Sequence, residues 1–450
     1  MKLKPPIIFL LLLLLNPYYL ILTTPSFAQE KLTLEESVRL GLKTNPSVIA
    51  SQKKVEAAEA RLRQAVGAFF PTVKLDGNYG KAYTQPSTVQ ITMPTTLGAV
   101  TQTYTFGTDA TSDTKGWTAS LSQPLFVAAL WPGFQIAQKN VALAKADLRQ
   151  ITLETSFNIT QAYFAVLMAE KLVKLSEQSV EMARYHFNQV KFMVSAGTAT
   201  RSDLLRTEVQ LVNSEVALTK AKNALEIARD AFNNALGRNL AAEVKIAEED
   251  LSAKIISLPD YAGLLKLAFE NRPDWKQFIL SREIAEENVG LAQTAYLPTV
   301  LLSGQTGNRI TEYPAYRSDV NSWSVTGIAS WTLFDGLGTQ NRIWEAAANL
   351  EAQKATEEQV KNGIALEVRN AYLNLKSILE VVGSAKKALE SAEENYKVSE
   401  QRYRAGVGTN LEVIDAQVAL TQARINYFQS QFDLIIAQAK INKVVGKEVI

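Results

Sequence analysis

The sequence contains no cysteine and one histidine, His186, among its 450 residues. Without cysteine the chain has no disulfide, no thiolate metal site, no cysteine nucleophile and no lipid-bearing cysteine of a lipoprotein. A single histidine excludes two-histidine zinc motifs, and the sequence shows neither a metal cluster nor a histidine-based triad. We therefore expect no enzyme activity, no metal and no cofactor, and we expect His186 to be an ordinary helix residue.

A long apolar run is found only at the start of the chain. Lys2 and Lys4 precede an apolar stretch from Ile7 to Leu22, and small residues follow up to Ala28. This pattern predicts a secretory signal peptide over residues 1–28, with the mature chain beginning at Gln29. The alternative is an uncleaved membrane anchor, but the stretch is interrupted and falls short of the ~20 residues that span a bilayer.

An excess of charge of either sign is also lacking. Without Lys2 and Lys4, 45 basic and 45 acidic side chains remain, so there is no electrostatic footprint for nucleic acid. After the leader no run approaches the length of a spanning helix. If the chain enters a membrane it must do so with strands, because only helices and closed barrels satisfy their backbone groups in lipid.

The sequence does contain an internal repeat. "AFFPTVKLDGNYG" (68–80) matches "AYLPTVLLSGQTG" (295–307) at an offset of 227 residues, whereas "SQPLF" at Ser122 matches "SWTLF" at Ser330 at an offset of 208. The offset is then 209 up to the glycines Gly197 and Gly406. A self-similar period indicates a duplicated structural unit, and the change of offset means that the first copy has a longer connection between its strands.

Each copy contains two stretches that alternate between apolar and polar residues. In the first copy the stretch after Pro71 puts Val73, Leu75 and Tyr79 on one face, and Lys74 and its polar neighbours on the other. Such alternation is typical of strands between lipid and a wet lumen, although a soluble two-faced sheet shows it too. Three tryptophans on these stretches are candidates for an aromatic girdle: Trp117, Trp323 and Trp331.

The connections between the paired strands are expected to be external loops. The first is the segment from Thr84 to Thr114, which holds eleven threonines in 31 residues, and the second is the shorter segment from Arg309 to Val320. Their composition suits solvated turns between strands.

Long helices follow the strands. Residues 134–196 and 340–405 are helical in pattern, which at 1.5 Å per residue means about 95 to 100 Å each. Shorter helices, at about 200–236 and 409–445, follow Gly197 and Gly406, where a chain reversal needs positive backbone angles. Each shorter helix and the helix before the strands could stack end to end to match one long helix.

The duplicated plan resembles the TolC family of outer-membrane efflux proteins. The resemblance is carried by the "FFPTV" and "YLPTV" junctions, by "SQPLF" and "WTLF", and by "RYRAGVGTNLEVIDAQ" (402–417). It implies an α+β membrane protein: a homotrimer in which every chain gives four strands to one 12-stranded β-barrel, continuous with a long periplasmic α-helical barrel. The strand count alone requires an oligomer, since the smallest membrane barrels have about eight strands, but it leaves dimer and trimer open.

The expected organisation has four parts. They are a signal peptide (1–28), a first repeat (29–237) with a β-hairpin at about 69–127 and a helical tip near 197, an equatorial linker (238–271), and a second repeat (272–450) with a β-hairpin at about 296–334 and a helical tip near 406.

The resemblance also implies a periplasmic gate at the helical tips. Glu412 and Asp415 match the acidic residues that narrow the family's entrance, and Asp203 aligns with Glu412 in the first copy; the alternative is a solvated helix face. The hydrogen-bonding candidates beside the gate are Arg402, Tyr403, Arg404 and Arg206, and the adaptor-docking candidates are Gly197, Thr198, Gly406 and Gly408.

The expected function is a passive outer-membrane conduit, the exit duct of a tripartite efflux pump or type I secretion system. Its expected partners are two further copies of the chain, outer-membrane lipid, a periplasmic adaptor and, through the adaptor, an inner-membrane transporter. The alternative is a periplasmic coiled-coil scaffold without a pore, which would not need the tryptophan-bearing strands.

Overall fold

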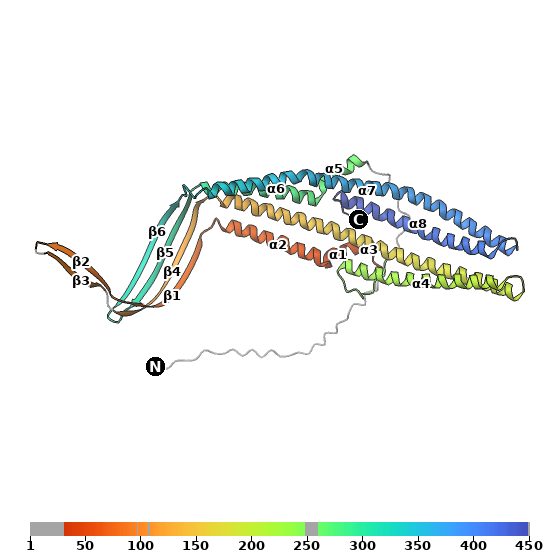
Figure 1. The fold of residues 1–450 in the computed structure, drawn as a ribbon, viewed down its shortest axis with the longest axis horizontal. Coiled ribbons are helices and arrows are strands. Elements are labelled where there is room, and N and C mark those ends of the chain that lie inside the picture. The colour runs from red at the N-terminus through yellow and green to blue at the C-terminus, as the bar shows by residue number, and fades with distance from the viewer. Residues whose placement is uncertain (1–30, 97, 107–108, 248–259, 449–450) are drawn as a thin grey trace, which may run out of the picture.

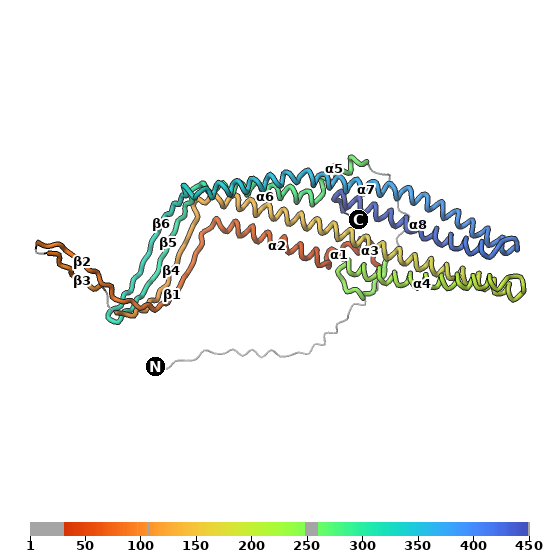
Figure 2. The backbone as a smooth tube through the Cα atoms, viewed as in Figure 1, coloured from red at the N-terminus to blue at the C-terminus, as the bar shows by residue number. Residues whose placement is uncertain are grey.

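In the computed structural model, which describes residues 31–96, 98–106, 109–247 and 260–448, the chain is strongly elongated. Figures 1 and 2 show the strands at one end, a layer of long helices in the middle and two helical turns at the far end. The expected signal peptide and its cleavage site lie outside the described residues.

Helices form most of the molecule. They are α1 (Leu34–Thr44), α2 (Pro46–Gly67), α3 (Leu130–Ser195), α4 (Arg201–Leu236), α5 (Tyr261–Asn271), α6 (Pro273–Gln293), the short 3-10 helix η1 (Thr294–Tyr296), α7 (Gly338–Arg404) and α8 (Asn410–Val444). The 66 residues of α3 and the 67 of α7 correspond to about 100 Å each. Both long helices are confirmed, although α3 begins four residues earlier than the pattern predicted.

Six strands belong to two separate sheets. They are β1 (Thr72–Thr84), β2 (Ser87–Thr95), β3 (Gly98–Phe106), β4 (Ala110–Val127), β5 (Thr299–Glu312) and β6 (Arg317–Ser330). The main sheet has the order β1-β4-β5-β6 with every neighbouring pair antiparallel, while β2 pairs only with β3. The four strands expected from one chain therefore lie side by side in a single sheet, with β1 and β6 at its edges.

The register of the main sheet separates apolar from polar side chains. Leu75 lies opposite Ala119, Ala119 opposite Thr306, and Thr306 opposite Trp323. Since side chains of directly paired residues point to the same face, this row and the next one, Val73–Leu121–Gly304–Val325, form an apolar face. The rows between them are polar, for example Lys74–Ser120–Gln305–Ser324.

The predicted loops were wrong in extent. Strand β5 runs to Glu312 and β6 starts at Arg317, so the second connection is a tight turn closed by a hydrogen bond from Tyr313 N to Tyr316 O (2.9 Å). The threonine-rich segment is largely the β2–β3 hairpin. Threonine is β-branched and favours extended structure, so its abundance indicated strand where we expected loop.

The tryptophans occupy different positions. Trp117 and Trp323 lie on β4 and β6 with their side chains on the apolar face, and Trp323 is 80% exposed in the single chain. The expectation that Trp331 belongs to the return strand was wrong, because β6 ends at Ser330. The indole of Trp331 donates a hydrogen bond to the carbonyl of Tyr296 (3.0 Å), which ties it to the helix-to-strand junction.

The shorter helices stack end to end in pairs. Asn45 Nδ2 donates to the carbonyl of Ala235 (3.0 Å), so α2 begins where α4 ends. Arg272 Nη1 donates to the carbonyl of Val444 (3.1 Å), so α6 begins where α8 ends. The predicted stacking is thus confirmed, and it satisfies carbonyls that a helix C-terminus leaves without partners.

A glycine stands at each joint because the two backbones nearly touch. Gly237 and Gly446 have φ angles of 71° and 73°. A Cβ on Gly237 would lie 2.9 Å from the carbonyl oxygen of Thr44, and one on Gly446 would lie 2.7 Å from that of Asn271. Left-handed backbone and close approach together select glycine at both places.

The two joints also hold the largest apolar clusters. Around the α2–α4 joint, α1 and the 244–246 segment pack against α3 and α4 through Val38, Ile159, Tyr163, Phe232 and Ile246. Around the α6–α8 joint, α5 packs against α7 and α8 through Leu264, Ala268, Val368, Leu434 and Ile441. The part of the linker over residues 248–259 lies outside the described residues.

Over the described ranges, every helix lacks a stretch of 18 residues that is apolar enough to cross a membrane.

Candidate functional site: the helical tips

The α3–α4 and α7–α8 turns lie at the end of the molecule opposite the sheet (Figure 1). Gly197 and Gly406 have φ angles of 77° and 72°. The residue after each glycine donates a backbone hydrogen bond to a carbonyl in the last turns of the preceding helix. The bonds run from Thr198 N to Met193 O (2.9 Å) and from Val407 N to Arg402 O (3.0 Å). The predicted left-handed reversal is confirmed at both tips, and it satisfies the last carbonyls of the long helices.

Gly408 is required for a different reason. A Cβ at this position would lie 3.0 Å from the backbone nitrogen of Tyr403 and 3.0 Å from Cβ of Arg402. The second tip therefore folds back tightly onto the last turn of α7, which brings Arg402 beside the start of α8.

A threonine begins each helix that leaves a tip and positions an acid three residues later. Thr200 Oγ1 accepts from Asp203 N (3.1 Å) and Thr409 Oγ1 accepts from Glu412 N (3.3 Å). These are N-cap bonds, and an acid in the first turn is favoured by the positive end of the helix dipole. The aligned acids Asp203 and Glu412 thus occupy equivalent places.

The two acids are held differently. The carboxylate of Asp203 accepts bonds from the Thr200 hydroxyl (2.6 Å) and backbone (3.2 Å), and these bonds hold the pKa of Asp203 below its usual range. The side chain of Asn410 on α8 also donates to the Asp203 carbonyl (3.2 Å). Asp203 is therefore engaged at the contact between α4 and α8.

Glu412 and Asp415 lie exposed on α8, three residues apart and so on neighbouring positions of one face. The guanidinium of Arg402 lies 3.6 Å from the Glu412 carboxylate, and both side chains are about half exposed. Glu412 thus has a cation beside it within its own tip.

A buried polar group joins the two tips, and the sequence analysis missed it. His186 on α3 is only 4% exposed, and its Nε2 lies 2.7 Å from Oδ1 of Asn410. Its ring meets the ring of Tyr403 edge to face at 5.4 Å between centroids. Burial lowers the pKa of His186. The hydrogen bond to Asn410 and the charge of Glu400 act in the opposite direction, but their effect is smaller. His186 lies within α3, as expected of a helix residue, and its contacts connect α3 to α8 and α7.

Of the remaining candidate residues at the tips, one is buried and the others lie on the surface. Tyr403 is buried with Val190 and Val413, and burial raises its pKa. Arg404 bonds to Glu400 on its own helix and donates to the hydroxyl of Tyr185 on α3 (3.1 Å). Arg206 is exposed in a groove between α4 and α8 that Leu205, Val209 and Ile414 also line.

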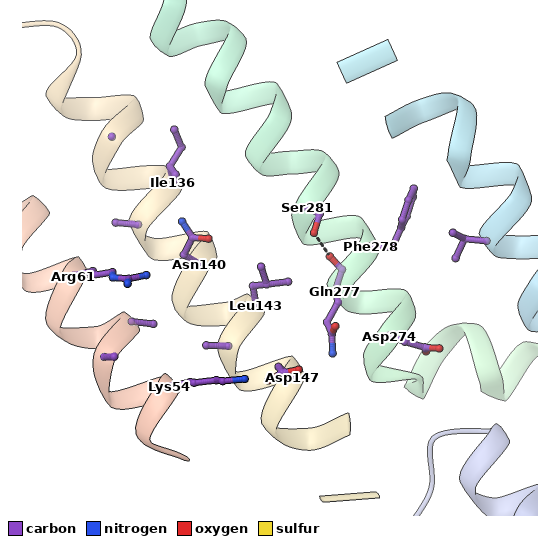
Figure 3. Close-up of a pocket in the computed structure, with 16 residues that line it drawn as sticks. Lys54, Arg61, Ile136, Asn140, Leu143, Asp147, Asp274, Gln277, Phe278 and Ser281 are labelled. Carbon is purple, nitrogen blue, oxygen red and sulfur yellow. Dashed lines mark hydrogen bonds between the residues drawn. The ribbon is translucent and has the colours of Figure 1, made fainter. Parts of the chain in front are cut away.

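A larger groove of about 950 Å³ lies along α3 between α2 and α6, away from the tips. Figure 3 shows its charged side chains: Lys54 and Arg61 from α2, Asp147 from α3 and Asp274 from α6. The groove mixes charges of both signs. Within the described ranges no three His, Asp or Glu residues gather as a metal site. The groove is thus a space between neighbouring helices, lined by charges of both signs.

Comparison with known proteins identifies the family. A family model described as "Outer membrane efflux protein" matches residues 38–238 and 264–447, which cover both tips, both joints and all strands.

Curated relatives match the chain over nearly its whole length. The outer membrane protein TolC of Salmonella enteritidis is 21% identical, over 94% of this chain and 83% of its own. The alkaline protease secretion protein AprF of Pseudomonas aeruginosa is 22% identical, over 96% and 88%. The cobalt-zinc-cadmium resistance protein CzcC of Cupriavidus metallidurans is 26% identical, over 94% and 92%.

Solved structures share the fold. The outer membrane protein VceC of Vibrio cholerae superposes with a TM-score of 0.74 at 16% identity, covering 93% of this chain and 97% of its own. The outer membrane channel MtrE of Neisseria gonorrhoeae, in its open state, gives 0.75 at 19% identity, with 92% and 89% covered. With the family model spanning most of the sequence, these comparisons confirm the resemblance: the chain belongs to the outer membrane efflux protein family.

Proposed function

We propose that three copies of this chain form an outer-membrane channel with a periplasmic helical tunnel, the exit duct of a tripartite efflux pump or type I secretion system. The observation that carries the proposal is the four-stranded sheet, which has one apolar face and two unpaired edges, β1 and β6. An edge strand is a template for pairing with another chain, and four strands are too few to close a membrane barrel.

The helical layer also supports oligomer formation. Apolar side chains lie exposed on α4 and α7, among them Val209 (60%) and Leu366 (62%). Helices α2 and α4 lie along one side of α3, whereas α6 and α8 lie between α3 and α7. The stacked α2–α4 pair and α7 are thus the outer helices of the layer. A ring of identical chains, in which α2 and α4 of one copy pack beside α7 of the next, would cover both apolar surfaces.

The duplicated sequence supports two repeats per chain, each giving two strands to the main sheet and one helical hairpin. The barrel of a trimer then has twelve strands, and the trimer has six tips, two from every chain. The exposed tips around Gly197, Thr198, Gly406 and Gly408 are the proposed docking site of the periplasmic adaptor. The relatives AprF and CzcC are named for protease secretion and for metal resistance, so membership of the family assigns no cargo.

Glu412 and Asp415 are the proposed selectivity residues at the periplasmic end. If their face of α8 lines the axis, three copies gather six carboxylates there, which concentrate cations and hinder anions. Because Arg402 lies 3.6 Å from Glu412, its charge offsets that of Glu412, and Asp415 is expected to contribute more to the selectivity.

Planar bilayer recordings of the purified protein test both parts of the proposal. Conductance by an oligomer of three chains supports the channel, whereas a non-conducting protein supports the coiled-coil scaffold. Asp415→Asn should lower cation over anion selectivity more than Glu412→Gln does. Asp203→Asn is the matched control, since Asp203 is engaged by Thr200 and Asn410, and its effect should be the smallest. Unchanged selectivity in both α8 variants would refute the gate assignment while leaving the channel intact.

A further inference from the structure

The β2–β3 hairpin extends beyond the four-stranded sheet, at the end farthest from the tips (Figure 1). It pairs in a regular antiparallel register from Ser87↔Phe106 to Thr95↔Gly98. The hairpin continues from β1 and β4, so its base stands at the edge strand of the main sheet. It is an element of its own that the proposed channel does not explain.

The two faces of the hairpin differ in character. One face carries a ladder of threonines, in which the hydroxyls of Thr92 and Thr101 lie 2.9 Å apart. The opposite face is apolar, and its large side chains are 38% to 57% exposed in the single chain: Val89, Ile91, Met93, Val100, Tyr104 and Phe106.

A hairpin of this kind is incomplete without a partner. A two-stranded ribbon is marginally stable in water unless a third strand or another surface covers its apolar face. Both edges of the ribbon also carry unpaired backbone groups, and neither strand has the charged residues with which exposed edges are normally protected. Pro94, near the turn, is the single residue that would hinder edge pairing.

The surrounding sequence narrows the choice of partner. The 27 residues from Ala82 to Thr108 contain no Asp, Glu, Lys, Arg or His. A charged protein surface would find no complementary group here, and the phosphates of a lipid surface would find no basic side chain. Hydrocarbon is a poor partner as well, because the free backbone groups of both edges would have no hydrogen bonds there.

Further copies of the same hairpin can both cover the apolar face and pair with the free edges. Uncharged identical surfaces meet without repulsion, and β3 of one copy can pair with β2 of the next, so that a ring of copies leaves no free edge. The hairpins also start next to β1, the strand that in the proposed channel pairs with a neighbouring chain.

We propose that the β2–β3 hairpins of the assembled chains associate through their apolar faces and free edges into an uncharged collar over the outer mouth of the channel. The inference rests on the proposed trimer. Three hairpins supply six strands, half the number in the barrel beneath them, and the diameter of a closed sheet grows with strand number. The collar is therefore narrower than the barrel and restricts the exit.

Cysteine crosslinking tests the collar directly, because the chain has no cysteine of its own. Val100→Cys places a thiol on the apolar face, and Thr101→Cys places one on the threonine face of the same strand. The oligomeric state of both variants is measured first by sizing in detergent. Each is then oxidised in outer membranes, and chains are separated with and without reductant.

We expect Val100→Cys to give a reducible, disulfide-linked pair of chains beside one unlinked chain, since a disulfide joins two of three copies. Thr101→Cys should stay unlinked and react with a membrane-impermeant maleimide in whole cells. If the Val100→Cys variant forms oligomers but neither crosslinks nor resists the maleimide, the collar is overturned and the proposed channel stands. If the protein is a monomer, the proposed channel is overturned as well.

Two further measurements separate the collar from its alternatives. A variant lacking residues 87–106 should keep its oligomeric state and show a larger single-channel conductance; an unchanged conductance contradicts the restricted exit. An environment-sensitive probe on Val100→Cys should be insensitive to lipid-borne quenchers in nanodiscs. Strong quenching would mean that the hairpin lies in the membrane, and would overturn the proposal.

Discussion

Single residues hold the places where helix ends meet. Gly446 has a positive φ of 73°, and a Cβ added to it would lie 2.7 Å from the backbone of Asn271. A Cβ added to Gly383, inside α7, would have no other atom within 4 Å in the single chain. Gly446→Ala should therefore destabilise the protein by about 1–3 kcal/mol, through strain and displacement of the joint. Gly383→Ala should be neutral or stabilising by up to about 1 kcal/mol. Thermal unfolding of both variants checks the pair, and equal losses would contradict the role of the joint.

His186 makes the tips sensitive to pH. Its pKa is lowered by burial, so the fold favours the neutral ring, and the unfolded chain binds the proton more readily. The stability that the neutral ring contributes is present above the ordinary pKa of about 6.5, and it is lost as the pH falls toward the lowered value. The groups facing His186 are Asn410, Tyr403 and Glu400, with Asp203 behind Asn410.

We expect proteolysis at the tips to rise as the pH is lowered from ~8 to ~5, with cleavage mapped by mass spectrometry. His186→Gln keeps a nitrogen that can donate to Asn410 but does not titrate. This variant should lose most of the pH dependence. The same pH dependence in His186→Gln would assign the effect to other groups.

At the scale of elements, the register of the main sheet decides which side chains would meet lipid in the proposed channel. Val325 and Ser324 are neighbours on β6, but Val325 belongs to the apolar row with Leu121, and Ser324 to the polar row with Ser120. Val325→Arg should cost about 2–4 kcal/mol if it lies near the bilayer midplane, whereas Ser324→Arg should cost little in a wet lumen. The amount of heat-resistant oligomer in outer membranes measures both. The reverse order would mean that the polar face meets lipid.

At the scale of the whole molecule, the exposed apolar side chains along α4 form the surface that a neighbouring chain would cover in the proposed oligomer. Val209 is 60% exposed and Glu208 beside it is also exposed. Burial of a valine contributes about 1.5–3 kcal/mol per side chain, so Val209→Asp should lower the temperature at which the oligomer dissociates. Glu208→Asp, which keeps the charge, should leave it nearly unchanged. An oligomer that tolerates both variants equally would remove this surface from the interface.

The sequence alone determined the order and type of most elements. The long helices, the four strands of the main sheet and the glycine reversals follow from periodicity, proline and glycine, which act over a few residues. The acid Glu412 was singled out through the resemblance to the family and Asp203 through the alignment of the two copies, whereas the threonine caps that position both acids appear only in the structure. The end-to-end stacking of the shorter helices in pairs was also accessible, since it required only a comparison of helix lengths.

Tertiary structure decided what depends on partners distant in the chain. The separation between His186 and Asn410 is 224 residues, and that between Arg272 and Val444 is 172; no local pattern marks either contact. The end of β6 before Trp331 and the pairing of β2 with β3 depended in the same way on the partner strand. A strand needs a second strand for its hydrogen bonds, whereas a helix makes its own, so the helices were predicted more accurately than the threonine-rich hairpin.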